Sequence, residues 1–207
     1  MHFLITAGGT REYIDPVRFI GNASSGRMGY ALARTAVGAG HKVILVTAHA
    51  AELVPKGVKI VRVETAGQMF EAVKGHFEKC DCLIMAAAVA DYTVALPARS
   101  KIKKSAKGLT IKLKPTVDIL KWAGEHKKKE QIVVGFALED KAIRARARKK
   151  LVGKKLDMII ANSPAAIGSN KASVQIKMPG CEWLELFEAT KITIAKKIIF
   201  LAGRGLS

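Results

Sequence analysis

Side chains that suit an anionic ligand gather between the first predicted strand and the first predicted helix. This loop reads GGTREYIDPVRFIGNASSG over residues 8–26 and contains Arg18, Asn22, Ser24 and Ser25. Serine hydroxyls and the unpaired N–H groups of a helix N-terminus suit phosphate, while arginine binds carboxylate or phosphate in a two-pronged contact. Asparagine both donates and accepts hydrogen bonds. We therefore predict a site for an anion and an acyl group in this loop, in preference to simple turn chemistry.

Two further stretches are expected to meet this loop at one edge of a sheet. Gly8 and Gly9 follow the first predicted strand, and Ala87 and Ala88 lie where the fourth ends. Open parallel sheets bind ligands beyond the carboxyl ends of their strands, so all four residues are expected at the site. Their small size would allow a ligand to approach the backbone, although two core alanines explain Ala87 and Ala88 about as well.

Basic residues are concentrated in one part of the chain. Residues 99–155 hold 19 Lys and Arg against 5 Asp and Glu, which accounts for most of the net charge of +18. Such a field attracts nucleic acid, an anionic membrane or a phosphorylated small molecule, and composition does not choose among them. The lysine-rich segment 92–114 is too polar for a core strand, and we expect a functional loop that leads into a short edge hairpin.

Strand and helix patterns alternate along most of the chain. Apolar runs predict strands at residues 2–7, 42–47, 58–63, 82–87, 131–137 and 158–161, and helical periodicity predicts helices at 26–38, 67–78, 117–125 and 139–152. A hairpin over 173–177 and 183–187 and a helix over 189–202 follow. This order predicts one α/β domain over residues 1–207, with a Rossmann-like, doubly wound, mostly parallel sheet, a basic loop and a C-terminal hairpin at the sheet edge.

Composition also bears on where the protein acts. No apolar run approaches the roughly 20 residues that span a bilayer, and the apolar residues 3–7 lack the basic region and the length of a signal peptide. The three cysteines, Cys80, Cys82 and Cys181, cannot all pair with one another and do not have the spacing of a zinc site. We expect a cytoplasmic protein without a membrane partner and without a metal site built from side chains alone.

The run NASSGRMGYALA also looks like the glycine turn of short-chain dehydrogenases. An NAD(P)-dependent enzyme of that kind needs an acidic residue after the second strand to hold the ribose, and a tyrosine with a lysine four residues later. The second strand ends in LVTAHA, and Tyr13, Tyr30 and Tyr92 are not followed by such a lysine. Hydride transfer is therefore disfavoured.

Four motifs that occur in order resemble one known family. AGGTREYIDPVRFIGNASSGRMG, AAAVADY, KIKK and VGFALE together are similar to phosphopantothenate–cysteine ligase, an enzyme of coenzyme A biosynthesis. In many bacteria this ligase is the C-terminal half of a bifunctional flavoprotein, and the resemblance covers residues 3–162. It implies that the carboxylate of 4′-phosphopantothenate attacks the α-phosphorus of CTP or ATP, releasing pyrophosphate. The amine of cysteine then displaces the nucleotide from the acyl-nucleotidylate.

The resemblance also implies roles for residues on the substrate side. Asn22 matches the asparagine that holds the acyl intermediate, and a hydrogen-bond donor to such an oxyanion lowers the barrier by about 2.7–4 kcal/mol. Arg18 matches an arginine at the phosphopantothenate end, and Asp91 matches an aspartate that contacts substrate and nucleotide. The expected substrate-binding residues are Arg18, Asn22, Ser24, Ser25, Ala88 and Asp91.

On the nucleotide side, Lys101 matches a catalytic lysine on a mobile loop, whereas Lys103, Lys104 and Lys107 would only add to the local field. Lys150 and Lys154 match two lysines that bind the phosphates, and their spacing of four places them on one helical face. Phe136 matches an aromatic residue near the base. The expected nucleotide-binding residues are Gly8, Gly9, Ala87, Asp91, Lys101, Val117, Asp118, Ile119, Leu120, Phe136, Lys150 and Lys154.

One motif departs from the family pattern. Where the family usually reads Pro-Asp-Ile-Leu, residues 117–120 read VDIL, and the proline is displaced to Pro115. The turn into the following helix is therefore expected to differ. The resemblance further implies Mg²⁺ with the nucleotide, and no FMN because the decarboxylase half is missing.

The resemblance implies a homodimer in which the neighbouring subunit completes each active site. Residues 92–114 and 173–187 are the expected contacts, since exposed sheet edges invite pairing. Charge alone leaves another candidate, a basic protein that binds nucleic acid nonspecifically. Specific binding is disfavoured because the basic region has only Trp122 and Phe136 for base stacking and contains no recognised nucleic-acid-binding motif.

Overall fold

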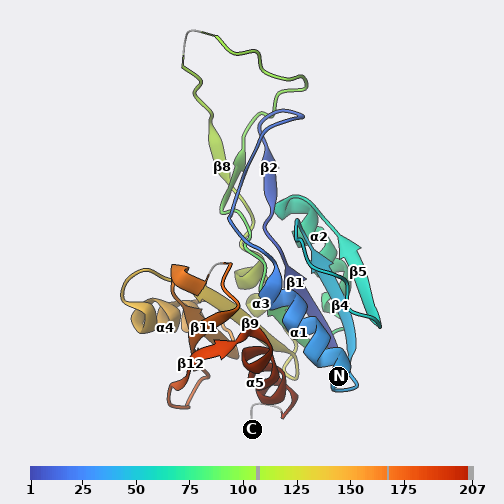
Figure 1. The fold of residues 1–207 in the computed structure, drawn as a ribbon, viewed down its shortest axis with the longest axis vertical. Coiled ribbons are helices and arrows are strands. Elements are labelled where there is room, and N and C mark those ends of the chain that lie inside the picture. The colour runs from blue at the N-terminus through green and yellow to red at the C-terminus, as the bar shows by residue number, and fades with distance from the viewer. Residues whose placement is uncertain (106–107, 167, 205–207) are drawn as a thin grey trace.

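The computed structural model describes residues 1–105, 108–166 and 168–204, so Lys107 lies outside the described residues. Its central element is an eight-stranded sheet in the order β12-β11-β10-β9-β6-β1-β4-β5 (Figure 1). The parallel strands are β1 (His2–Ala7), β4 (Lys42–Thr47), β5 (Val58–Arg62), β6 (Cys82–Met85), β9 (Ile132–Leu138) and β10 (Met158–Asn162). Antiparallel β11 (Lys171–Lys177) and β12 (Leu184–Thr190) extend one edge. The predicted Rossmann-like sheet and its C-terminal hairpin are confirmed.

Helices cover both faces of the sheet. One face carries α1 (Arg27–Gly38) and α5 (Lys191–Gly203), and the other carries α2 (Ala66–Phe77), α3 (Ile119–His126) and α4 (Ile143–Gly153). Successive side chains of a strand point to opposite faces, so in β1 Phe3 and Ile5 belong to the first layer and Leu4 to the second. Burial on both faces explains the continuous apolar runs of the strands. Within the described residues, no helix has both the length and the apolar character to cross a bilayer.

Several helix starts differ from those predicted. The helix expected from residue 139 begins at Ile143, because Ala142 takes a left-handed conformation with φ 49° and ends the preceding loop. The helix expected from residue 189 begins at Lys191, because Thr190 accepts a hydrogen bond from the Thr193 N–H at 3.1 Å. Side-chain capping of this kind satisfies N–H groups that the helix leaves unpaired, and it fixes the first turn.

Two antiparallel ribbons project together from the carboxyl end of the sheet (Figure 1). One is the hairpin of β2 (Arg11–Tyr13) and β3 (Phe19–Gly21), and the other pairs β7 (Tyr92–Val94) with β8 (Leu113–Pro115). The Ala98 N–H donates to the Ile14 carbonyl at 2.8 Å and joins the ribbons. We call the described residues of 11–21 and 92–115 the arm. The hairpin predicted in the basic segment forms, since β7 and β8 pair with each other, but its predicted place at the edge of the main sheet is wrong, because the pair makes a separate two-stranded sheet.

Close approach of two segments explains a glycine inside α3. A Cβ added to Gly124 would overlap the carbonyl oxygen of Lys154. Gly124→Ala is expected to lower the free energy of unfolding by about 1–3 kcal/mol, the usual cost of overpacking. Urea denaturation would measure the change. Gly75→Ala in α2 is the matched control, since no atom of another segment lies within 4 Å of the added Cβ, and alanine favours a helix interior by roughly 0.5–1 kcal/mol. Equal midpoints for the two variants would contradict this interpretation.

Candidate functional site

The strand order of the sheet reverses between β1 and β6, and the candidate site lies at this switch point. β4 lies on one side of β1 and β6 on the other, so the loops that follow β1 and β6 diverge and leave a crevice at the carboxyl edge. Two buried hydroxyls fix the loop after β6. Thr6 accepts from the Ala87 N–H at 3.1 Å, and Thr10 accepts from the Ala90 N–H at 2.9 Å. Thr10 directly follows Gly8 and Gly9 and was expected at this edge of the sheet, whereas no role was predicted for Thr6, although a polar residue within an apolar strand is a signal for one.

A cavity of about 450 Å³ opens at this crevice, and we call it the α1 cavity. Asn22 lines it and donates its side-chain amide to the carbonyl of Val89 at 3.0 Å. This bond extends the Asn22 side chain from the loop after β1 to the loop after β6. The structure brings the following predicted site residues together in the α1 cavity: Asn22, Ser24, Ser25, Ala87, Ala88, Asp91, Phe136 and Lys150.

A second cavity of about 210 Å³ lies at the N-terminus of α3, and we call it the α3 cavity. The two cavities adjoin, since Asp91, Phe136 and Lys150 line both. Predicted nucleotide-binding residues that line the α3 cavity are Ala87, Asp91, Val117, Asp118, Ile119, Leu120, Phe136, Lys150 and Lys154. The arrangement suits a ligand with several phosphates, because lysine side chains and the first turn of a helix face one cavity.

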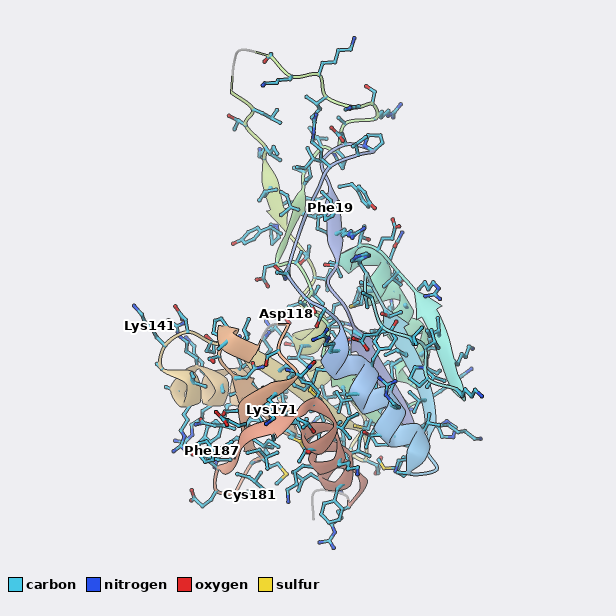
Figure 2. The ribbon with its side chains drawn as sticks, viewed as in Figure 1. Phe19, Asp118, Lys141, Lys171, Cys181 and Phe187 are labelled. Carbon is cyan, nitrogen blue, oxygen red and sulfur yellow. The ribbon has the colours of Figure 1, made fainter. Side chains whose placement is uncertain are left out.

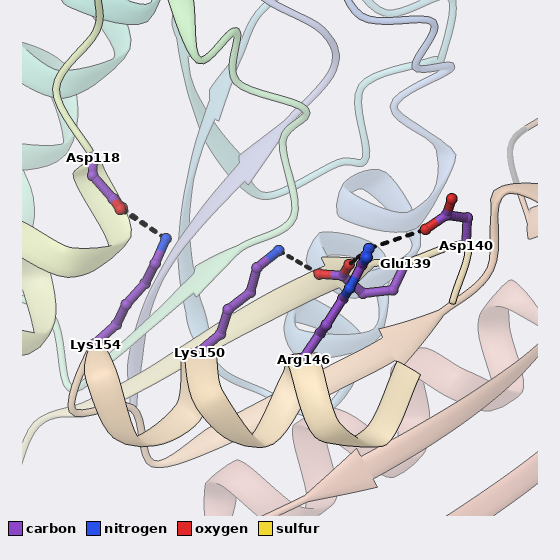
Figure 3. Close-up of polar contacts among 6 residues, drawn as sticks. All are labelled: Asp118, Glu139, Asp140, Arg146, Lys150 and Lys154. Atoms are coloured by element: carbon purple, nitrogen blue, oxygen red, sulfur yellow. Dashed lines mark hydrogen bonds and ion pairs between the residues drawn. The ribbon is translucent and has the colours of Figure 1, made fainter. Parts of the chain in front are cut away.

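Asp118 positions both α3 and Lys154. Its carboxylate caps α3 by accepting from the Lys121 N–H at 3.0 Å, and it pairs with the Lys154 ammonium at 2.8 Å (Figure 3). Burial by itself would raise the pKa of Asp118, but the hydrogen bonds from Lys154 and Lys121 and their charges hold it below its ordinary value of 3.8. The predicted helix start at residue 117 moves to Ile119, because the cap residue precedes the first turn.

Glu139 holds Lys150 at the boundary of the two cavities. The Lys150 ammonium lies 2.7 Å from one carboxylate oxygen of Glu139, and Arg146 lies 3.2 Å from the other (Figure 3). Arg146 also pairs with Asp140 at 3.0 Å. Burial would raise the pKa of Glu139, but hydrogen bonds from Lys150 and Arg146 lower it below its ordinary value of 4.5. Glu139 ends the VGFALE motif, but no role was predicted for it from the sequence.

Comparison with known proteins identifies the family of the chain. Residues 1–202 match the family described as the DNA/pantothenate metabolism flavoprotein C-terminal domain. The chain belongs to this family. It is 51% identical over 169 residues to the coenzyme A biosynthesis bifunctional protein CoaBC of Bacillus subtilis, which covers 81% of this chain and 41% of that protein. The chain therefore spans less than half the length of this curated relative.

Solved structures agree with the family. The C-terminal domain of a coenzyme A biosynthesis bifunctional protein CoaBC superposes with a TM-score of 0.83 at 41% identity, covering 96% of this chain and 92% of that one. The DNA/pantothenate metabolism flavoprotein from Streptococcus pneumoniae superposes with a TM-score of 0.85 at 25% identity, covering 99% of both chains. The family resemblance predicted from the four motifs is thereby confirmed.

Two predicted site residues, Arg18 and Lys101, lie on the arm and away from both cavities. Arg18 pairs with the buried carboxylate of Asp15 at 2.9 Å and donates to the carbonyl of Ile102 at 3.0 Å, while Lys101 is the residue next to Ile102. Neither Arg18 nor Lys101 lines the α1 or the α3 cavity of its own chain. The expectation that Arg18 and Asn22 form one site within a single loop is corrected, because the β2–β3 hairpin carries Arg18 away along the arm.

Asp15 is the residue that joins the two ribbons at this end of the arm. Its carboxylate accepts from the N–H groups of Val17 and Arg18, both at 2.8 Å, and from the Ile102 N–H at 3.1 Å. Burial would raise the pKa of Asp15, but these three backbone hydrogen bonds and the Arg18 charge hold it below its ordinary value of 3.8. An ionised Asp15 therefore fixes the backbone beside Lys101.

Gly8 and Gly9 have a packing role at the base of the crevice. Gly8 has φ +80°, and an added Cβ would lie 2.6 Å from the His49 carbonyl oxygen. A Cβ on Gly9 would lie 2.7 Å from the carbonyl oxygen of Asn22. Both glycines thus let neighbouring loops, including the Asn22 loop, pack against the end of β1. Neither lines the α1 or α3 cavity, and their contact with a nucleotide stays a prediction.

Proposed function

We propose that residues 1–207 act as one catalytic unit that joins 4′-phosphopantothenate to L-cysteine with CTP or ATP as co-substrate. The observation that carries this proposal is the pair of adjoining cavities, with Asn22 in one and Lys150 and Lys154 in the other. Membership of the pantothenate metabolism family and similarity to the Bacillus subtilis coenzyme A biosynthesis protein support it.

The proposed reaction has two steps. In the first, a carboxylate oxygen of 4′-phosphopantothenate attacks the α-phosphorus of the nucleotide, a C–O–P bond forms, and pyrophosphate leaves. In the second, the cysteine amine attacks the acyl carbon and a C–N bond forms. The nucleoside monophosphate leaves with the electron pair of the broken C–O bond, and the amine releases a proton to solvent. An asparagine amide carries two N–H donors, so Asn22 can donate one to Val89 and the other to the acyl oxygen.

The nucleotide occupies the α3 cavity in this proposal. Lys150 and Lys154 bind its phosphates and exchange contacts with Glu139 and Asp118 for contacts with phosphate oxygens. Because both carboxylates hold the lysines beside the cavity beforehand, little side-chain ordering remains when the nucleotide binds. Phe136, which lines both cavities, lies between the nucleotide and the acyl substrate.

Mg²⁺ fits this arrangement as an ion that arrives with the nucleotide. Across the described residues no three His, Cys, Asp or Glu side chains form a cluster that could hold a metal by themselves. Mg²⁺ commonly binds through one or two carboxylates together with substrate phosphates, and Asp91 is a carboxylate that lines both cavities. When bound, Mg²⁺ would neutralise charge on the phosphate oxygens.

The arm supports a homodimer in which Lys101 and Arg18 act in the partner's cavities. Several of its apolar side chains are exposed, with 89% exposure for Leu96, 58% for Val17 and 57% for Tyr92. Figure 2 shows Phe19 on the arm, well away from Asp118 near the base of the arm. Exposed apolar surface of this kind marks contacts between proteins. A second subunit would cover it and receive Lys101.

Asp15→Asn tests whether the arm must be ordered for activity. The neutral amide is a weaker acceptor for the Ile102 N–H and no longer pairs with Arg18, so the backbone beside Lys101 loosens. Misplacement of a group by 1 Å costs about 100-fold in rate, and we expect a fall in kcat of about this size. Steady-state kinetics and hydrogen exchange over residues 92–105 measure the two effects. In the control Asp140→Asn, exchange in the arm stays unchanged.

The same contacts predict an acid-dependent arm. Because the pKa of Asp15 in the folded protein lies below 3.8, its stabilising effect is complete above that value. The effect is lost as the pH falls through the lower folded pKa. The intrinsic rate of exchange itself falls in acid, so the quantity to compare is the protection factor of residues 92–105. In the wild type this factor should fall as the pH drops, whereas Asp15→Asn should lack this part of the response. Identical acid profiles for the two proteins would contradict the role of Asp15.

Incubation of the purified protein with 4′-phosphopantothenate, cysteine, Mg²⁺ and either CTP or ATP tests the proposed function. Pyrophosphate release that requires phosphopantothenate supports the first step, and the amide product detected by mass spectrometry supports the second. Comparison of the two nucleotides identifies the preferred base. Salt-sensitive binding of a polynucleotide without any pyrophosphate release would instead favour the basic nucleic-acid-binding alternative.

A further inference from the structure

Two cationic side chains, Arg27 and Lys191, also line the α1 cavity. Arg27 is the first residue of α1, and Lys191 is the first residue of α5. β12 runs antiparallel to β11, which runs antiparallel to β10, so β12 ends at the same edge of the sheet as the parallel strands. The two helices therefore both begin at the carboxyl edge, beside Ser24 and Ser25.

Asn170 connects these two cations. Arg27 donates through Nη1 to the Asn170 side-chain oxygen at 3.0 Å and to the Gly168 carbonyl at 2.7 Å, while its Nε lies 3.3 Å from Glu52. The Lys191 N–H donates to the Asn170 carbonyl at 3.2 Å. The guanidinium is thus fixed by three contacts, and the first turn of α5 is tied to the same residue.

The electrostatics of this wall favour a ligand with two negative charges. Burial, and after it the charge of Arg27, lowers the pKa of Lys191 below its ordinary value of 10.5. A dianion placed beside both cations would stabilise the charged lysine and offset their mutual repulsion. The N-terminal ends of α1 and α5 add partial positive charge at the same place.

We propose that Arg27 and Lys191 bind the 4′-phosphate of phosphopantothenate and make the enzyme specific for the phosphorylated acyl substrate. This inference rests on the proposed function. The joined cavities then have two groups of cations, with Lys150 and Lys154 for the nucleotide and Arg27 and Lys191 for the substrate phosphate. With its phosphate held at the start of α1 and α5, the substrate directs its carboxylate along the α1 cavity toward the α3 cavity, where the nucleotide binds.

Lys191→Gln is the cleanest test, because Arg27 also holds Gly168, Asn170 and Glu52. A hydrogen bond to a charged group contributes enough to predict an increase of about 10- to 100-fold in the Kd and KM for phosphopantothenate. The kcat, the KM for the nucleotide and the affinity for unphosphorylated pantothenate should change less than about twofold, since their contacts lie elsewhere in the cavities. Lys191→Arg should recover most of the affinity for phosphopantothenate.

Isothermal titration without nucleotide gives the Kd values, and Lys196→Gln, an exposed position on the same helix, is the matched control. Equal weakening for phosphorylated and unphosphorylated pantothenate, or an unchanged Kd for phosphopantothenate, would overturn the inference. A wild-type protein that binds phosphopantothenate through Lys191 but releases no pyrophosphate would contradict the proposed function alone. A wild-type protein that does not bind phosphopantothenate would contradict both.

Discussion

Asn22→Asp is expected to slow amide formation by about 10²- to 10³-fold, the usual effect of removing one donor to an oxyanion. The aspartate side chain would place an oxygen where the Asn22 amide now donates to the Val89 carbonyl, 3.0 Å away. It would also add a negative charge to a cavity proposed to hold phosphates. Because Asn22 is proposed to act chiefly as cysteine attacks, pyrophosphate release in the first turnover should survive better than amide formation.

Rapid-quench measurements of pyrophosphate and amide separate the two steps for this variant. Asn22→Ala is the matched control, since it removes the donor without adding charge. Similar losses for the two variants would assign the effect to the donor, and a much larger loss for aspartate would assign the excess to charge. Amide formation at a nearly wild-type rate in Asn22→Asp would contradict the proposed role of Asn22.

Lys101→Gln is expected to lower kcat by a similar 10²- to 10³-fold, because a cation that offsets charge on the α-phosphate is lost. Lys101 lines neither cavity of its own chain, so the proposal requires it to act in the partner subunit. Mixing Lys101→Gln with Asn22→Asp should then restore activity. A heterodimer holds one site with both changes and one with neither, and equal mixing of a twofold dimer should recover about a quarter of wild-type activity.

The control for this mixing experiment combines Asn22→Asp with Asn22→Ala, which leaves every site without its asparagine. No recovery is expected there. Differently tagged subunits allow the heterodimer to be isolated and its formation checked. An isolated heterodimer of Lys101→Gln and Asn22→Asp that stays inactive would show that Lys101 and Asn22 serve the same site from one chain. A Lys101→Gln homodimer with nearly wild-type kcat would show that Lys101 has no catalytic role.

The sequence by itself determined the sheet and much of the crevice. The predicted bounds of β1 and β4 match the structure, because strands buried on both faces leave uninterrupted apolar runs. The residues expected beyond the strand ends, including Asn22, Ser24 and Ala88, meet in the α1 cavity. This was predictable because parallel strands bring their carboxyl ends to one edge, whatever the details of the loops.

Only the tertiary structure decided which distant groups meet. The three-residue strands β2 and β3 are too short to leave a periodic pattern, so the ribbon that separates Arg18 from Asn22 was not predictable. A hairpin was expected within residues 92–114, but its position apart from the main sheet was not. The pairing of Lys150 with Glu139, and of Arg27 and Lys191 with one cavity wall, joins residues on different elements. Local periodicity reports which face of an element is buried, whereas contacts across elements depend on how the chain winds around the sheet.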